Sequence, residues 1–379
     1  MFALRRLKIA FFCWESLYGV RVGGLAPAAT CLAEALARDH EVHFFTRGSG
    51  PPEKNGVVYH YCDPHGGNIV EFCKDLALKA CRQFGEQDSP PFDILHFHDW
   101  HFVEAMHRLR ERKTVLSFHS TEYGRNGNQK GGWWEFGEIS GKEWYCAYIA
   151  KRVVAVSKTL RGEVMALYNV PDWKIDAVPN GIDPEAFAVQ VDQGAVKRRY
   201  GIHPYAPLVF FGGRLVYQKG PDILVKAIPS VLRHRWDANF VFAGKGDMQD
   251  WVARHTRDMP AQVLGYLAER DFVSLLNAAD IVAIPSRNEP FGLILTEAWS
   301  AGRCVVASDV GGLGENIEHL VDGVKVPVSA GGMADGINTV IDDRRLCSTL
   351  GRKGREKVER EFRWEAVARA MERVYEKVL

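Results

Sequence analysis

Residues 286–302 read Ser-Arg-Asn-Glu-Pro-Phe-Gly-Leu-Ile-Leu-Thr-Glu-Ala-Trp-Ser-Ala-Gly and decide the fold of the C-terminal half. The apolar run 280–285 that precedes them is typical of a buried parallel strand. Pro290 and Gly292 interrupt this run, and from Leu293 onward the apolar residues recur at helical spacing. The segment therefore predicts a strand, a tight loop and a helix.

The start of this helix has the features of an anion site. The backbone N–H groups of Phe291, Gly292 and Leu293 would lie at a helix N-terminus, where unpaired donors and the helix dipole favour negative charge. Glu289 comes just before this point, and Glu297 lies one turn inside the helix. A phosphate held by amides, with carboxylates nearby to accept sugar hydroxyls, would suit a nucleotide-sugar. The same spacing also fits an ordinary strand–helix unit with two surface glutamates.

The bulk composition indicates a two-domain globular protein. At 379 residues the chain is too long for one typical hydrophobic core. Its content of 46% hydrophobic and 25% charged residues argues against disorder. The net charge of +1 gives no electrostatic reason to expect nucleic acid as a partner.

The cysteines and the N-terminal segment indicate the cellular compartment in which the protein is expected. The eight cysteines contain no Cys-x-x-Cys pair and no metal-finger spacing, so we interpret them as free thiols in a reducing cytosol. Segment 1–10 carries Arg5, Arg6 and Lys8 before a short apolar run. It lacks a small-residue cleavage site, and the run is too short to span a bilayer. We therefore expect a first strand, a cytoplasmic protein and no membrane association.

The first loop of the N-terminal half resembles a phosphate-approach position. Residues 8–13 predict a strand, and Pro27 suits the first turn of the helix that follows. Gly23 and Gly24 thus open a helix after the first strand, where ligands gather in α/β folds. The dinucleotide fingerprint Gly-x-Gly-x-x-Gly is absent. A plain turn would explain the glycine pair equally well.

Polar side chains follow two further strands of this half. His98, Asp99, Trp100 and His101 come directly after the apolar run 94–97, and His119 follows the run 114–118. Such a cluster is costly to bury without purpose, although capping and packing remain an alternative. No third ligand has a spacing that matches the two histidines, so no metal site is predicted. Other strands are expected at 42–46, 57–61, 153–156 and 175–179, and helices at 69–84 and 159–168.

Residues 120–134 form a polar, glycine-rich loop that ends in Trp133 and Trp134. Long loops in compact domains are usually functional or mobile. These two side chains, together with Trp144, could stack on sugar rings or could close the loop onto the body of the domain. The tryptophan-rich loop 123–144 is our candidate for acceptor selection.

The strand–loop–helix pattern restarts in the C-terminal half. Residues 208–212 predict a strand and residues 221–234 a helix, with Gly213, Arg214 and Lys219 in the loop between them. Two cations at this position would neutralise a diphosphate, the arginine by a fork and the lysine as a point charge. Two solvated basic residues are the alternative.

Further loops of this half have the same character. A strand at 239–243 ends in Gly244 and Lys245, and Tyr266 with Leu267 follows the next apolar run, where the tyrosine could stack on a base. Residues 304–308 predict another strand. Residues 364–379 predict an amphipathic C-terminal helix.

Five blocks along the chain together match one family. They are Arg21-Val-Gly-Gly-Leu25, His98-Asp-Trp-His101, His119, Arg214 with Lys219, and Glu289 with Glu297. They are similar, in order, to the Lys-x-Gly-Gly-Leu loop, the His-Asp-Trp-His block, the active-site histidine, the Arg-x4-Lys pair and the Glu-x7-Glu motif of glycogen synthases. The chain thus resembles the retaining glycosyltransferases of GT-B architecture, in the group that holds glycogen and starch synthases and family 4 enzymes.

The resemblance implies an α/β fold with two Rossmann-like domains that face each other across a cleft. The expected N-terminal, acceptor-side domain comprises residues 1–184 plus 364–379, because the C-terminal helix of the family crosses back to it. The expected nucleotide-sugar donor-binding domain comprises residues 185–363.

The resemblance also implies roles for individual residues. The catalytic group would be His119, Arg214, Lys219 and Glu289. The donor would be bound by Arg21, Gly23, Gly24, Asp99, Gly213, Gly244, Lys245, Tyr266, Leu267, Phe291, Gly292, Leu293 and Glu297. The acceptor would contact Trp100, His101, Trp133 and Trp134. Family chemistry requires no metal and no cofactor beyond the nucleotide-sugar.

The implied function is transfer of glucose from ADP- or UDP-glucose to an α-glucan, as in glycogen synthases. Arg21 stands where those enzymes have lysine, and the chain is nearer family 4 length. A family 4 enzyme acting on a small sugar, a sugar phosphate or a lipid-linked acceptor is therefore the alternative. A binding protein without turnover, or an epimerase of the same architecture, would not need all five blocks.

Overall fold

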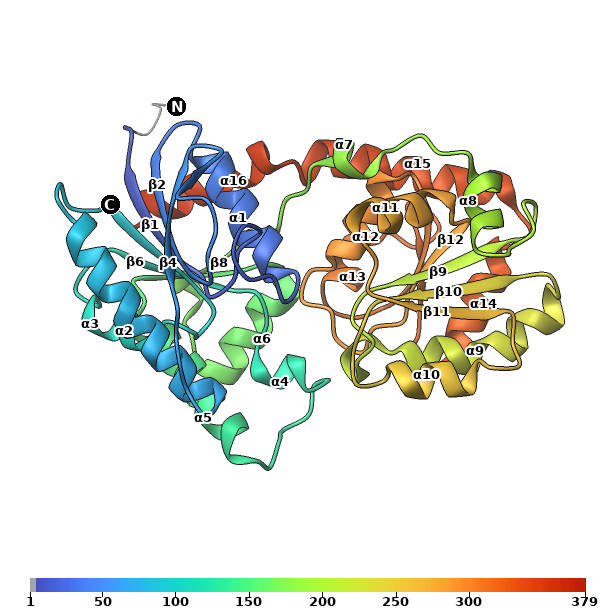
Figure 1. The fold of residues 1–379 in the computed structure, drawn as a ribbon, viewed down its shortest axis with the longest axis horizontal. Helices are drawn as coiled ribbons and strands as arrows, with labels where there is room; N and C mark the ends of the chain where they lie inside the picture. The colour runs from blue at the N-terminus through green and yellow to red at the C-terminus, as the bar shows by residue number, and fades with distance from the viewer. Residues whose placement is uncertain (1–4) are drawn as a thin grey trace. The chain divides into compact units, whose positions relative to one another are not determined.

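The computed structural model describes residues 5–379, so the first four residues of segment 1–10 lie outside the described residues. The chain folds into two compact units, each around its own sheet (Figure 1). The N-terminal unit comprises the chain up to Tyr123, Gln129–Gly181 and Trp364–Leu379. The C-terminal unit comprises Gly124–Asn128 and Ile182–Arg363.

The N-terminal unit contains an eight-stranded sheet in the order β3-β4-β2-β1-β5-β6-β7-β8. All neighbouring strands are parallel except the short β3, which pairs antiparallel with β4. The strands are β1 (Lys8–Phe12), β2 (Glu41–Arg47), β3 (Glu53–Lys54), β4 (Val57–Cys62), β5 (Ile94–His98), β6 (Thr114–Phe118), β7 (Arg152–Ala155) and β8 (Ile175–Ala177). Strands such as β1 and β6 are buried along their whole length because helices cover both faces of the sheet.

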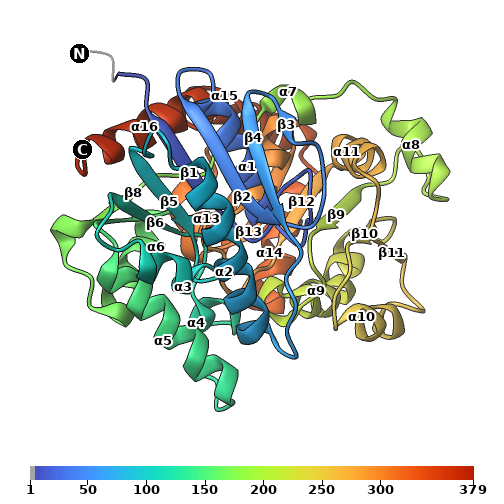
Figure 2. The ribbon, with the colours of Figure 1, turned by 60° about the vertical axis from the view of Figure 1, so that its left-hand side comes forward.

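One face of this sheet is covered by α1 (Leu25–Leu36) and the C-terminal helix α16 (Trp364–Glu376), whose buried residues share one core with β1 and β2. The C-terminal helix thus returns to the N-terminal unit, as expected. The other face carries α2, α3, α5 and α6, which Figure 2 shows in front of the strands. These helices are α2 (Ile69–Gln87), α3 (Val103–Arg108), α5 (Trp134–Ile149) and α6 (Lys158–Tyr168), and the unit also contains the 3₁₀ turn η1 (Asp172–Lys174). The short α4 (Glu122–Arg125) has residues in both units.

The C-terminal unit contains a six-stranded parallel sheet in the order β11-β10-β9-β12-β13-β14. The strands are β9 (Leu208–Gly212), β10 (Asn239–Ala243), β11 (Ala261–Gly265), β12 (Ile281–Ile284), β13 (Cys304–Ser308) and β14 (Val324–Val326). The apolar side chains of β9, β10, β12 and β13 form its core with α9 and α14.

In the C-terminal unit, α9, α10 and α14 lie on one side of the sheet, and α11 and α12 lie on the other (Figure 1). The helices are α7 (Pro184–Phe187), α8 (Gln193–Arg199), η2 (Tyr217–Lys219), α9 (Pro221–His234), α10 (Gln249–His255), α11 (Glu269–Ala278), α12 (Leu293–Ser300), α13 (Gly311–Asn316), α14 (Ala330–Val340) and α15 (Arg344–Glu361).

Each sheet has a topological switch point. This is the central strand from which the chain adds strands first on one side of the sheet and later on the other side. In the N-terminal unit β1 pairs with β2 on one side and with β5 on the other. In the C-terminal unit β9 pairs with β10 on one side and with β12 on the other. Ligands of open α/β sheets bind outside the carboxyl ends of the strands at such points. The loops that follow β1, β5, β9 and β12 are therefore the natural site elements.

Most of the elements predicted from the sequence are confirmed. The strands at 208–212, 239–243 and 304–308 and the helix at 221–234 have the expected bounds. The strand expected at 175–179 ends at Ala177, and the two-residue β3 was not predicted. Within the described residues, all eight cysteines are free, and no helix is long and apolar enough to cross a membrane.

Candidate functional site

In the C-terminal unit, the loops after β9 and β12 meet through an ion pair. Lys219 Nζ lies 2.6 Å from Glu289 Oε2, and Ser286 Oγ donates to the same oxygen at 3.1 Å. The Glu289 side chain is 7% exposed and the Lys219 side chain 22%. Because the pair is held in a partly buried place, the ammonium group is fixed beside the switch point rather than free in solvent.

Close backbone approaches hold these loops together. Gly220 has a φ of +64°, and a Cβ atom there would overlap the carbonyl oxygen of Pro285. A Cβ atom at Gly311 would likewise overlap the carbonyl oxygen of Glu289, which accepts a hydrogen bond from Gly312 N at 2.7 Å. The three loops after β9, β12 and β13 are thus nested without intervening side chains, which brings backbone amides to the site.

A second pair, not found by sequence reasoning, also connects these loops. Arg287 donates to both carboxylate oxygens of Asp222 at 2.8 Å, and its guanidinium lies 3.9 Å from the centre of the Tyr217 ring. The hydrogen bonds to Asp222 raise the pKa of Arg287, and those from Arg287 lower the pKa of Asp222 against its partial burial. The pair fixes the start of α9 to the loop that carries Glu289.

The residues predicted at a helix start lie there. Gly292, with a φ of +98°, precedes the first residue of α12, Leu293. Phe291 is buried beside it, and Glu297 lies one turn inside α12, partly exposed. The first backbone N–H groups of α12 therefore come directly after the loop that carries Glu289.

The other predicted donor residues follow the neighbouring strands. Arg214 is exposed after β9, and its guanidinium donates to Gln218 Oε1 at 3.2 Å. Gly244 follows β10, in such close contact with Gly213 that no Cβ atom would fit. The exposed Lys245 comes next along the chain.

Tyr266 follows the edge strand β11, and its side chain is 68% exposed. Gly244 N donates to Gly265 O at 2.7 Å, so the loop after β10 lies against the residue that precedes Tyr266. Leu267 is half-buried next to it. An exposed ring at a strand end is available for stacking, in keeping with the expectation for this residue.

In the N-terminal unit, the loop after β1 is held by a carboxylate that sequence reasoning missed. Glu15 is buried, and its Oε2 accepts from Val22 N at 2.7 Å and from Gly23 N at 2.9 Å. Arg21 is exposed beside this point, and Gly24 caps α1. No atom of the described residues lies within 4 Å of a Cβ atom built at Gly23, so its outer side is open.

Asp99 occupies a strained backbone position at the end of β5. Its φ is +54°, which is uncommon for a residue with a side chain. Its N–H donates to Ser117 O at 2.9 Å, and its Oδ1 accepts from the backbone N–H of His119 at 2.8 Å. Asp99 therefore connects the ends of β5 and β6 and fixes the backbone of His119.

Three histidines cluster behind this point: His96 and His98 are buried, and His119 is partly exposed. His98 Nδ1 lies 2.9 Å from His119 Nε2, and His98 stacks on His96 with ring centres 4.3 Å apart. Burial lowers the pKa of His119 to about 4 and that of His96 to about 3, and it lowers the pKa of His98 as well. All three imidazoles are therefore neutral at pH 7. His119 could serve there as a hydrogen-bonding group rather than as a cation.

The structure changes the interpretation of Trp100 and His101. Trp100 is 2% exposed and packs in a small core with Cys73 of α2 and Ile139 of α5. His101 is stacked between Trp14 and Trp100, with ring centres 4.3 and 4.8 Å away. In this structure Trp100 cannot offer a face to an acceptor, because its ring is buried among apolar side chains. The stack supports the loop that carries Asp99.

Trp133 and Trp134 lie at the start of α5 and are 47% and 57% exposed. Trp133 contacts Phe136 edge-on. Their exposure leaves both rings available, as the acceptor prediction requires. Within residues 5–379, no group of three or more histidine, cysteine, aspartate or glutamate side chains is placed to hold a metal ion.

Comparisons with known proteins place these residues in a family context. Residues 22–186 match the model of glycosyltransferase family 4, and residues 192–357 match the model of glycosyl transferases group 1. An uncharacterized glycosyltransferase of Methanocaldococcus jannaschii is 34% identical over 97% of this chain and 98% of its own length. Glycogen synthase of Mycobacterium tuberculosis is 31% identical over 97% of this chain and 94% of its own length.

Solved structures share the fold. The catalytic domain of starch synthase IV from Arabidopsis thaliana, bound to ADP and acarbose, superposes with a TM-score of 0.81 at 17% identity. The match covers 98% of this chain and 99% of that chain. The two parallel-sheet units are thus those of the GT-B architecture, which confirms the expected fold class.

Proposed function

The chain belongs to the glycosyltransferases of group 1 and family 4, and we propose that it carries glucose from ADP- or UDP-glucose to an α-glucan acceptor with retention of anomeric configuration. The C-terminal unit binds the nucleotide-sugar in this proposal, and the N-terminal unit provides the acceptor side. The enzyme works in the cytoplasm and needs no metal ion.

The observation that carries this proposal is the arrangement around Lys219. Its ammonium group, the amides at the start of α12 and the nearby Arg214 all belong to loops at the switch point of one sheet. A point charge, a fork and aligned N–H groups each favour phosphate, so their combination suits a diphosphate. When the donor binds, Lys219 exchanges part of its contact with Glu289 for a phosphate oxygen.

In the proposed reaction, the bond between the anomeric carbon of glucose and the diphosphate oxygen breaks as an acceptor hydroxyl attacks that carbon from the same face. The departing diphosphate takes the electron pair, and Arg214 and Lys219 stabilise its growing negative charge. The proton of the acceptor hydroxyl passes to a diphosphate oxygen. Stabilisation of the leaving group is the main contribution of this chain.

The remaining residues position the donor. Glu297 binds the ribose hydroxyls, and Tyr266 stacks on the base. Glu289, Asp99 and His119 contact the transferred sugar. The neutral state of His119 suits a hydrogen bond to a sugar hydroxyl, because a neutral imidazole can donate or accept without an unpaired charge.

The acceptor assignment depends on the His98-Asp-Trp-His101 block and on the similarity to glycogen synthase. The test is nucleotide release from ADP-glucose and UDP-glucose, each with and without glycogen or maltooligosaccharide. Release from one donor that the glucan stimulates is expected. The Lys219→Ala protein should lose this release, whereas Lys353→Ala, on the exposed face of α15, should keep it.

The alternative is a family 4 enzyme that uses a small sugar, a sugar phosphate or a lipid-linked acceptor. It is favoured by Arg21, which replaces the lysine of the glycogen synthase loop. Donor-dependent release that no glucan stimulates would support this alternative and would exclude the α-glucan acceptor. No release from any donor would contradict both assignments.

A further inference from the structure

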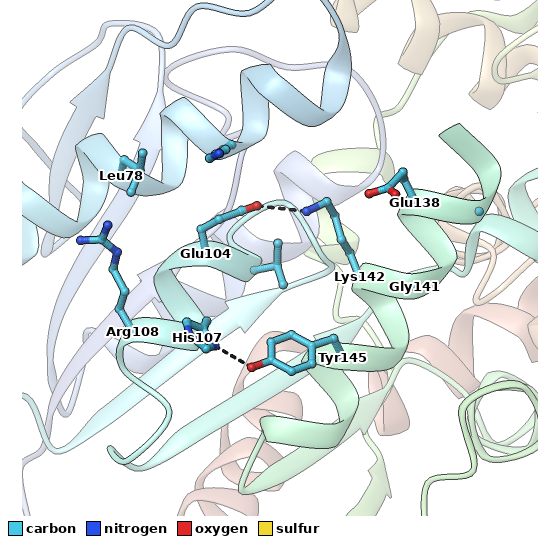
Figure 3. Close-up of a pocket in the computed structure, with 11 residues that line it drawn as sticks. Leu78, Glu104, His107, Arg108, Glu138, Gly141, Lys142 and Tyr145 are labelled. Atoms are coloured by element: carbon cyan, nitrogen blue, oxygen red, sulfur yellow. Dashed lines mark hydrogen bonds and ion pairs between the residues drawn. The ribbon is translucent and has the colours of Figure 1, made fainter. Parts of the chain in front are cut away.

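The N-terminal unit contains a second potential ligand site, apart from all residues assigned to transfer. A pocket of about 530 Å³ lies between α2, α3 and α5 (Figure 3). This volume is within the range of about 300–1,000 Å³ that is usual for small-molecule sites. The lining comes from Lys74 and Leu78 of α2, four residues of α3 that begin at Val103, and five residues of α5 between Gly137 and Tyr145.

Two glycines open this pocket. Gly137 and Gly141 lie one turn apart in α5 and both line the cavity. Among the described residues, no atom lies within 4 Å of a Cβ atom built at either position, so close packing does not require glycine here. Glycine is less favourable than alanine inside a helix. The missing side chains leave space that any larger residue would fill.

The pocket has an excess of positive charge. Lys74, Arg108 and Lys142 come from three different helices and line it together. Lys142 Nζ is held 3.0 Å from Glu104 Oε1, as Figure 3 shows. Lys74 and Arg108 form no ion pair with any of residues 5–379. Two cations from separate helices are thus available to an anion, and the arginine fork suits phosphate or carboxylate.

The pocket also contains acceptors and hydroxyl groups that suit a sugar. Glu104 Oε2 is buried and receives no hydrogen bond within the part of the chain that the structure describes. The Glu104 side chain as a whole is 23% exposed, so its carboxylate can also accept a hydroxyl of a ligand in the pocket. Tyr145 OH lies 2.5 Å from His107 Nδ1, and Glu138 lies on the same side of α5 as Lys142 in Figure 3.

We propose that this pocket binds a small anionic carbohydrate, a sugar that carries one phosphate or one carboxylate group. The anionic group lies between Arg108 and Lys74, and the hydroxyls bond to Glu104 and Tyr145. Val103 N, at the first residue of α3, donates to Trp100 O at 2.9 Å, so the wall of the pocket continues directly into the His98-Asp-Trp-His101 block. This proposal concerns binding and does not depend on the identity of the acceptor.

Calorimetric titration of the full chain tests the proposal. The probes are glucose 6-phosphate, glucuronate, glucose and inorganic phosphate. At least one of the two anionic sugars should bind with one site per chain. Glucose and inorganic phosphate should bind at least about tenfold more weakly, because each lacks half of the contacts. Comparison of the two sugars distinguishes phosphate from carboxylate as the anionic group.

Matched variants locate the binding. Gly141→Leu fills the cavity and should abolish binding, whereas Gly162→Leu, at an exposed glycine of α6 with equally open surroundings, should not change it. Arg108 is exposed, so Arg108→Gln should not affect folding. This variant should weaken binding about tenfold. Lys219→Ala should leave this binding unchanged, because Lys219 belongs to the C-terminal unit and does not line this pocket.

The proposal is wrong if neither anionic sugar binds at millimolar concentration. It is also wrong if Gly141→Leu and Arg108→Gln both bind as the wild type does. Loss of binding in Lys219→Ala, with both pocket variants unaffected, would assign the anion to the C-terminal unit instead. Thermal unfolding of each variant checks that every measured change comes from a folded protein.

Discussion

At the switch point of the C-terminal sheet, Lys219 and Glu289 form a charged pair, whereas at that of the N-terminal sheet His98 and His119 share a hydrogen bond as neutral rings. The C-terminal edge thus centres on a lysine–glutamate ion pair, whereas the N-terminal edge places neutral imidazoles beside the carboxylates of Asp99 and Glu15. At the C-terminal edge the loops approach each other closely at glycines, and at the N-terminal edge the histidine rings stack on one another. A charged edge suits a diphosphate, and an edge of neutral hydrogen-bonding groups suits sugar hydroxyls.

The largest effect is expected from Lys219→Ala, which removes the charge from the C-terminal edge. The rate of transfer should fall about 10²–10³-fold, the range seen when one preorganised donor to a developing anion is lost. The measurement is kcat for nucleotide release at saturating donor. Lys219→Arg should recover part of the rate, because charge is kept. An unchanged kcat in Lys219→Ala would refute the phosphate role of this residue.

A second test examines the nested backbone of the same edge. Gly220 and Gly201 have φ values of +64° and +67°, but only at Gly220 would a Cβ atom meet a neighbouring carbonyl. Gly201→Ala should cost about 1–2 kcal/mol in unfolding free energy from the left-handed conformation alone. Gly220→Ala should cost more, because the loop must also move away from Pro285. Urea unfolding measures both.

Equal losses of unfolding free energy in these two variants would show that the loop after β12 gives way without strain. The close approach at Gly220 would then not be needed to position Glu289. A larger loss in Gly220→Ala, accompanied by a lower kcat, would link the nested backbone to the charged pair.

The neutral imidazoles of the N-terminal edge predict acid sensitivity. The pKa of His96 is lowered to about 3 and that of His119 to about 4, whereas in the unfolded chain both lie near 6.5. Below pH 6.5 these histidines take up protons in the unfolded state, whereas in the folded state they stay neutral. The free energy of unfolding therefore decreases as the pH falls from 6.5 toward 4. Each such histidine contributes a slope of up to about 1.4 kcal/mol per pH unit.

Urea unfolding at pH 7, 6, 5 and 4.5 measures this slope. The His96→Gln protein is the control, because it should lose the share of one histidine and show a shallower decline below pH 6.5. A free energy of unfolding that stays constant between pH 7 and pH 5 would contradict neutral burial of the cluster. Acid sensitivity of the same slope in His96→Gln would assign it to other groups.

The smallest effect is expected from Ser117→Ala. Ser117 Oγ lies 2.7 Å from His96 Nε2, and Tyr375 OH lies 2.8 Å from His96 Nδ1. Loss of one partner should destabilise the protein by about 1–2 kcal/mol, because a buried ring nitrogen loses its hydrogen bond. Ser274→Ala, on the surface of α11, is the control and should change the unfolding free energy by less than about 0.5 kcal/mol.

If Ser117→Ala is as stable as the control, then the hydroxyl of Tyr375 alone is sufficient to hold His96. The prediction also extends the comparison of the two edges. Tyr375 belongs to the C-terminal helix, so the neutral cluster depends on a segment far away in the chain.

The local elements and the composition of the candidate site were predictable from the sequence by itself. Mainly apolar runs predicted the strands 208–212, 239–243 and 304–308, because strands covered on both faces by helices are mostly apolar. Ser157 directly precedes α6, and its side chain accepts from Leu160 N at 3.0 Å, the capping role that serine favours at a helix start. Each of the five blocks of site residues could be found because its own residues lie close together along the chain.

Only the tertiary structure decided which distant residues touch. Lys219 and Glu289 are 70 positions apart, and Arg287 and Asp222 are 65 apart, so no periodicity connects them. Trp100 is an apolar residue at a strand end, and whether its ring faces solvent or the core depends on α2 and α5. The pocket between α2, α3 and α5 exists because three helices leave a space where Gly137 and Gly141 have no side chain. Contacts of this kind arise from packing between elements, and a sequence pattern records only the period within each element.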